Sequence, residues 1–113
     1  MQKHTAEILI ITIFLSAFFY LPDRIAAATC DHLRTNITKE RNPIKRRALF
    51  RQAIDVGQDD AELRYSYAYE LERHRKYDEA LEQYQKVLEM NPTMAKAFFN
   101  MGDIYKSQEQ YKK

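Results

Sequence analysis

Residues 61–111 read AELRYSYAYELERHRKYDEALEQYQKVLEMNPTMAKAFFNMGDIYKSQEQY, and the pattern of 61–77 recurs at 95–111. Ala61 corresponds to Ala95, and Tyr77 corresponds to Tyr111. Between them, large residues align with large ones and small with small, as in the pairs Tyr67 and Met101, Ala68 and Gly102, and Leu71 and Tyr105. A fixed period of this length predicts a helical solenoid, because units that cannot bury their apolar faces alone must stack.

The residues at the positions of matching size are typical of one repeat family. The second copy reads Phe98-x-x-Met101-Gly102-x-x-Tyr105, and the first continues through Ala80-x-x-x-Tyr84 to Pro92. This pattern resembles the tetratricopeptide repeat (TPR), a helix–turn–helix unit of about 34 residues. The resemblance implies an all-α fold, a TPR-like helical solenoid of antiparallel helix pairs with about two repeats, the last one incomplete.

The composition fits a small helical protein. The chain has 113 residues and a formal net charge of only +2, so no global charge points to a nucleic acid partner. Two glycines and three prolines are few, which argues against an all-β fold. The single cysteine excludes an internal disulfide framework and a thiolate metal site. We expect no cofactor and no metal.

The segment 1–28 has the order of a secretory signal peptide. A weakly positive start at Lys3 and His4 precedes the apolar run Ile8–Leu21, and the small residues Ala26-Ala27-Ala28 follow. That order is typical of a signal that is removed after the small residues. We therefore expect cleavage after Ala28 and a mature chain that is secreted or periplasmic.

Two alternatives keep the N-terminus at a membrane. The apolar run is about 14 residues long, shorter than the ~20 that span a bilayer as a helix. With tilt or snorkelling it could nevertheless act as an uncleaved anchor, leaving the chain membrane-tethered and facing outside the cytoplasm. A lipid anchor on Cys30 is disfavoured, because Thr29 is a poor residue before a lipidated cysteine.

The rest of the chain is divided by its helix-start and helix-stop residues. The predicted parts are a poorly ordered linker or short helix at 29–41, an opening helix at 42–58, a TPR repeat at 61–94, and the first helix of a second, truncated TPR repeat at 95–113.

The opening helix is predicted from its ends. Asn42 can cap it, Pro43 suits its first position, and Gly57 can end it in the left-handed conformation. It looks like the second helix of a degenerate half repeat. Arg46 stands one repeat length before Ala80, where the family has a small residue, so the upstream half of that repeat is not expected.

The ends of the next helices are less regular. Asp59 and Glu62 fit a capping box at the start of a helix over Asp59–Arg73. Thr93 is predicted to cap the following repeat. Arg75 stands where TPRs usually carry glycine, so the turn between the two helices is expected to be strained, or the first helix to run on slightly.

The second repeat ends early. Its core is predicted to contain Ala97, Phe98, Met101, Gly102 and Tyr105. Its second helix should begin at Tyr111, and the remaining turns of that helix are missing. We expect either a fragment of a longer array, such as the TPR part of a multidomain protein, or a cap supplied by another chain, which includes a homo-oligomer.

A basic stretch precedes the repeats. Lys39–Arg51 holds six basic residues against one acid, Glu40. A solvated helix face is the ordinary explanation. Anionic lipid headgroups are the alternative, since such a surface offers ~1 kcal/mol per basic residue.

Nothing in the sequence is typical of a catalytic site. The three histidines, His4, His32 and His74, do not cluster with each other or with Cys30. No phosphate-binding glycine loop, catalytic triad order or metal-ligand spacing is present. We expect a protein that is not an enzyme.

The TPR resemblance implies a concave groove that holds a partner's peptide or helix, lined by the first helix of each pair. Its predicted lining is Glu62, Tyr65, Tyr69, Arg73, Lys96, Phe99, Asp103 and Lys106. Tyr65 and Phe99 are one repeat length apart and should lie side by side on adjacent repeats. The alternative for Tyr65 and Tyr69 is packing against the preceding helix at 43–56. The predicted function is a non-enzymatic protein–protein interaction module, a scaffold or adaptor.

Overall fold

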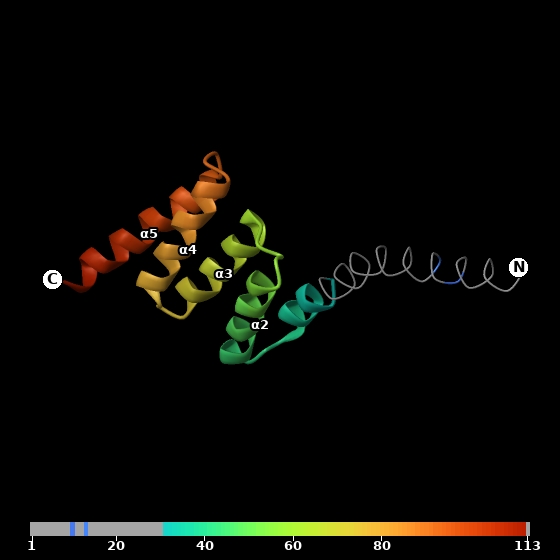
Figure 1. The fold of residues 1–113 in the computed structure, drawn as a ribbon. Helices are drawn as coiled ribbons and strands as arrows, with labels where there is room; N and C mark the ends of the chain where they lie inside the picture. Colours follow the sequence, from blue (N-terminus) through green and yellow to red (C-terminus); the bar gives the residue numbers. More distant parts are fainter. Residues whose placement is uncertain (1–9, 11–12, 14–30, 113) are drawn as a thin grey trace, which may run out of the picture. The chain divides into compact units, whose positions relative to one another are not determined.

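The computed structural model describes Ile10, Ile13 and residues 31–112. The chain divides into two compact units, Met1–Arg34 and Thr35–Lys113, and the second unit contains the packed helices (Figure 1). The described residues form α-helices and connecting turns, without a strand among them. The predicted signal peptide and Cys30 lie outside the described residues, apart from Ile10 and Ile13.

Four helices follow one another in the second unit: α2 (Pro43–Asp55), α3 (Ala61–Arg73), α4 (Tyr77–Met90) and α5 (Ala95–Tyr111). Each packs on the next one along the chain, α2 on α3, α3 on α4 and α4 on α5. The connections are short, so neighbouring helices run antiparallel (Figure 1). The predicted all-α, TPR-like arrangement is confirmed. Residues 31–39, for which a linker or short helix was expected, are helical.

The ends of α2 match the sequence expectation. The Asn42 side chain accepts hydrogen bonds from the backbone N–H groups of Ile44 and Lys45, at 2.9 and 3.2 Å. Gly57 follows the helix with φ +88°, a left-handed conformation that glycine adopts without steric cost. The boundaries of this helix are therefore encoded locally.

Two predicted caps were wrong. The N-cap of α3 is Asp60, whose carboxylate accepts from the N–H of Leu63 at 2.8 Å. Asp59 is instead held by the guanidinium of Arg64 at 2.5 Å, and is not available to the helix end. Thr93 does not cap α5, because its hydroxyl donates to the side chain of Asn91.

Arg75 confirms the strained turn. It has φ +57° in the short connection between α3 and α4. The turn is closed by N–H groups of Arg75 and Lys76, which donate to Glu72 and Leu71 at 2.8 and 3.0 Å. A left-handed conformation costs a residue with a side chain on the order of 1 kcal/mol. Arg75 adopts it at this cost, and α3 ends at Arg73 although no glycine follows it.

The core lies mainly between α3 and α4. Ala68 and Ala80 are fully buried, and these small side chains allow the two helices to approach closely. Leu71, Tyr84 and Val87 fill the space around them and are at most 1% exposed. On the other side of α3 the rings of Phe50 and Tyr67 stack with centroids 5.4 Å apart, which joins α2 to the array.

The predicted core of α5 needs correction. Ala97 is buried as expected, but Phe98 and Tyr105 are 56% and 52% exposed, and Gly102 is exposed as well. The buried large residue of α5 is Ile104. No described helix covers the side of α5 that carries these aromatic residues, because α5 packs chiefly on α4.

The predicted turn before Tyr111 is also absent. α5 continues through Gln108, Glu109 and Gln110 to Tyr111, whereas the equivalent positions in the first repeat form the turn. Glutamine and glutamate are good helix formers. Tyr111 therefore belongs to the last turn of α5 and does not begin a second helix.

Candidate functional site

The predicted groove residues lie on α3 and α5, and some of them are in direct contact. The ammonium of Lys96 lies 2.7 Å from a carboxylate oxygen of Glu62, and 4.2 Å from the ring centroid of Tyr65. The first contact joins an acid and a base that are one repeat length apart in the sequence. The second is a cation–π contact. Glu62, Tyr65 and Lys96 thus form one cluster across two repeats.

Tyr65 packs toward α4 and α5. Its ring lies 5.6 Å from that of Tyr84, and its hydroxyl accepts a hydrogen bond from the Asn100 side chain at 3.2 Å. These contacts are with α4 and α5, and not with the helix at 43–56 that the alternative prediction named for Tyr65. The side chain is half-buried, so one part of Tyr65 supports the fold and another part reaches the surface.

A buried polar network lies beneath this cluster. The hydroxyl of Tyr84 donates to the carboxylate of Glu72 and accepts from Asn100, each at 2.7 Å. Burial raises the pKa of Tyr84 far above its usual value, so the phenol stays protonated and remains a donor. Sequence reasoning missed Glu72 and Asn100 because it placed Tyr84 in the apolar core alone.

The other predicted groove residues are exposed and are not drawn into this cluster. Tyr69 is 48% exposed and Phe99 is 68% exposed. Arg73, Asp103 and Lys106 are exposed, and none of the three has an ion-pair partner within 4 Å in the part of the chain that the structure describes. These side chains are not used by the fold.

A buried carboxylate that the sequence did not reveal lies between α2 and α3. Glu70 is 4% exposed, and its oxygens lie 3.2 Å from Arg46 and 3.2 Å from His74. Arg46 also donates to the backbone carbonyl of Glu40. The arginine that departs from the family pattern is therefore the partner of a buried acid.

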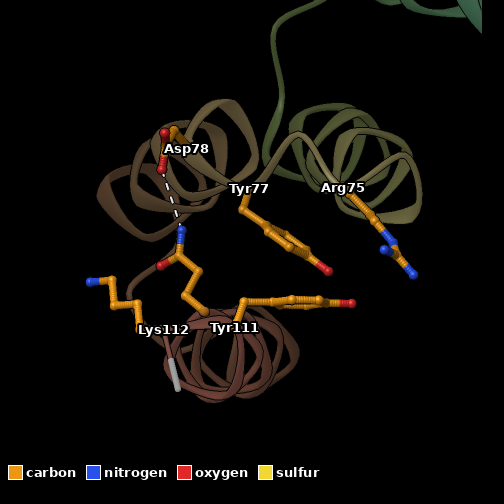
Figure 2. Close-up of a pocket in the computed structure, with 6 residues that line it drawn as sticks. Arg75, Tyr77, Asp78, Tyr111 and Lys112 are labelled. Atoms are coloured by element: carbon orange, nitrogen blue, oxygen red, sulfur yellow. Dashed lines mark hydrogen bonds between the residues drawn. The ribbon is translucent and has the colours of Figure 1, made fainter.

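An open pocket of about 660 Å³ lies beside the end of α5, and it was not predicted. Figure 2 shows the rings of Tyr77 and Tyr111 pointing the same way, with Arg75 beside them. The Arg75 guanidinium lies 5.8 Å from the Tyr111 ring centroid, and Gln108 donates to Asp78 at 3.4 Å. The pocket exists because α5 continues past the predicted turn and brings Tyr111 opposite Tyr77.

Within Ile10, Ile13 and residues 31–112 there is no cluster of three or more histidine, cysteine, aspartate or glutamate side chains that could hold a metal ion. In the same residues no helix combines the length and apolar character that crossing a membrane requires.

In a comparison with known protein families, the model described as TPR repeat matches residues 76–109. The match begins just before α4 and covers most of α5, so it joins the second helix of one pair to the first helix of the next. No curated protein and no solved structure matched the chain. TPR repeats are generally non-enzymatic modules for protein–protein interaction, and the match suggests an interaction module here.

Proposed function

We propose that the chain binds a peptide or helix of a partner protein on the surface that α3 and α5 form together, acting as a scaffold or adaptor outside the cytoplasm. The contact of Lys96 with Glu62 and Tyr65 carries this proposal, because it places the first helices of two successive repeats beside each other on one surface. Exposed aromatic residues ringed by mixed charges are typical of binding patches.

Apart from Glu62 and Lys96, which pair with each other, the exposed residues of this surface make no side-chain hydrogen bond or ion pair among the described residues. Phe99 offers an aromatic side chain that is two-thirds exposed, and Tyr69 one that is half exposed. Arg73, Asp103 and Lys106 provide charges of both signs without intramolecular ion pairs among the described residues. A partner with an aromatic or aliphatic anchor flanked by charges would fit these groups.

The groove is tested by photocrosslinking. A benzoylphenylalanine in place of Phe99 is expected to crosslink to a partner in cells, whereas the same residue in place of Gln85, exposed on α4, is not. For the partner found, Phe99→Ala with Tyr69→Ala should weaken binding by about tenfold or more, since hot-spot aromatics contribute about 2 kcal/mol or more. Equal crosslinking at both positions, or unchanged affinity, would show that the groove assignment is wrong.

Action outside the cytoplasm depends on residues 1–28. In the favoured case the signal is cleaved and the mature chain begins at Thr29. In the alternative the uncleaved segment tethers the chain as a membrane-bound assembly factor, or the repeats are the TPR part of a longer multidomain protein. The mass of the native chain separates these cases, because each predicts a different N-terminus or C-terminus.

We also propose that the chain self-associates through the side of α5 that no described helix covers. Phe98, Met101, Gly102 and Tyr105 follow the i, i+3, i+4, i+7 spacing of one helix face. Two of them are more than half exposed, and Gly102 has no neighbouring atom within 4 Å of a methyl group built on it. A glycine inside a helix costs about 1 kcal/mol relative to alanine. Close approach of another helix at that point would make use of the missing side chain.

Light scattering on the mature chain tests this face. We expect a dimer that becomes a monomer in the variant Phe98→Ser with Tyr105→Ser, because the exposed aromatic area supplies ~25 cal/mol per Å² when it is buried. The neighbouring Phe99→Ser is the matched control, since it lies on the groove face and should leave the dimer intact. A monomeric wild-type chain, or dissociation by the control alone, would contradict the proposal.

A further inference from the structure

The outer side of α2 carries positive charges that the fold does not neutralise. Of the six basic residues in Lys39–Arg51, only Arg46 is used by the fold, where it binds Glu70 and the Glu40 carbonyl. The other five have no ion-pair partner within 4 Å among the described residues. They are defined here as the basic face: Lys39, Arg41, Lys45, Arg47 and Arg51.

The helix geometry places Arg47 and Arg51 together, one turn apart, with Lys45 farther round the exposed arc. Phe50 and Ala53 mark the side of α2 that is buried against the array. Lys45, Arg47 and Arg51 fall on the remaining arc of the helix, at the step of about 100° per residue of an α-helix. Lys45 and Arg51 are exposed and Arg47 is half-buried at the edge of the arc.

Acidic residues do little to offset this charge. The Glu40 carboxylate accepts from the Asn42 backbone N–H at 2.8 Å, so it is occupied at the start of the helix. Asp55 follows Arg51 by one helical turn, but the two side chains make no ion pair within 4 Å. One nearby carboxylate offsets part of the charge, and the basic face stays net positive.

An exposed aliphatic residue lies within the same arc. Ile44 is 69% exposed and lies three residues before Arg47 and seven before Arg51, which places it on their side of the helix. Basic side chains around an exposed aliphatic residue on a convex helix are the combination that binds at the surface of an anionic bilayer, where charge attraction and buried apolar area add.

We propose that the basic face binds the anionic headgroups of a membrane surface, with Ile44 at the level of the headgroups. A lipid surface fits better than an acidic polypeptide, because the cations are spread over a face of α2, the loop before it and the end of the helical residues 31–39. Such a surface provides ~1 kcal/mol for each basic residue that reaches it. The contact uses none of the proposed groove residues, so it is independent of partner binding.

Co-sedimentation of the full chain with vesicles tests the proposal. The measured quantity is the ratio of binding to vesicles containing about 30 mol% phosphatidylglycerol over binding to pure phosphatidylcholine, since the apolar N-terminal run acts on both kinds alike. We expect the ratio to be well above one at low salt, and to fall steeply toward about 1 M NaCl, where the Debye length is only about 3 Å.

The key variant is Lys45→Gln, Arg47→Gln and Arg51→Gln, which removes three positive charges and takes the formal net charge from +2 to −1. It should lower the ratio by about tenfold or more. The matched control is Lys76→Gln, Lys86→Gln and Lys112→Gln, which removes the same charge from the start and the middle of α4 and from the residue after α5, outside the proposed groove. The control should retain most of the ratio. Arg47→Lys with Arg51→Lys keeps the charges and should bind like the wild type, which separates charge from folding.

Three results would overturn the proposal. One is equal binding of the wild type to anionic and neutral vesicles. Another is an equal loss in the Gln variant and its matched control, which would show a response to net charge alone. The last is release from the vesicles by soluble poly-glutamate at the same concentration of negative charge, which would show that the basic face prefers an acidic polypeptide. Retention on the vesicles in that competition supports the lipid surface.

Discussion

Tyr84→Ala is expected to lose about 3–5 kcal/mol of unfolding free energy, the range for removing a buried aromatic side chain. Tyr84 is fully buried on α4, and its ring packs against Tyr65 of α3. Because small domains are stable by only about 5–15 kcal/mol, this one side chain accounts for a large part of the stability of the array. Urea unfolding followed by circular dichroism measures the loss.

The hydroxyl of Tyr84 contributes to the free energy of unfolding separately from the ring. Tyr84→Phe keeps the ring but leaves the Glu72 carboxylate without its tyrosine donor and removes one of the two acceptors of Asn100, at a cost of about 1–3 kcal/mol. Tyr105→Phe is the matched control, because that tyrosine is 52% exposed, and its loss should be close to zero. Similar losses in the two Tyr→Phe variants would mean that the network has no net effect on stability.

Arg46→Ala is expected to lose about 2–3 kcal/mol of unfolding free energy. It removes the arginine partner of Glu70, a carboxylate that is 4% exposed, and leaves only His74 beside it. Breaking a buried ion pair costs more than this when both partners are fully buried, but the Arg46 side chain is 24% exposed and the cost is correspondingly smaller. Arg51→Ala removes the same charge from the exposed side of α2 and should cost less than about 0.5 kcal/mol.

The residues at equivalent positions of the next repeat suggest a second substitution that should restore stability to the Arg46→Ala variant. Glu70 is equivalent to Ile104, which is 1% exposed, and Arg46 is equivalent to the fully buried Ala80. The double variant Arg46→Ala with Glu70→Ile should therefore be more stable than Arg46→Ala alone by about 2 kcal/mol, because no buried charge remains. A double variant whose loss equals the sum of the two single losses would show that the pair is not coupled.

The repeat period predicted the helices and the α3–α4 core because size is repeated at the positions where helices touch. Ala68, Leu71, Ala80 and Tyr84 are all buried as the alignment required. The comparison of two copies could not predict Glu70, since a charge and an isoleucine at equivalent positions give no common pattern. Its partner Arg46 was recognised only as a departure from the family.

The errors at the helix ends have a different physical origin. Asp59 and Asp60 are adjacent and chemically identical, so the sequence does not distinguish them as caps. In the structure Asp59 pairs with Arg64, and Asp60 caps α3. Phe98 is exposed because no described helix packs over that side of α5. The sequence indicated that the second helix of this repeat is missing, but its pattern still placed Phe98 in the core. Of the predicted groove, the placement of Glu62 and Lys96 follows from the period, whereas binding of a partner stays a prediction.

The contacts of Lys96 with Glu62 and of Asn100 with Tyr65 span 34 and 35 residues, and each joins the first helices of neighbouring repeats. They are side-chain cross-links between the corresponding helices of two successive repeats. Both contacts help to hold α3 beside α5 on that side of the array. A ligand that bound Lys96 or Asn100 would compete with these contacts. Partner binding on this surface would then alter how α3 and α5 are held together.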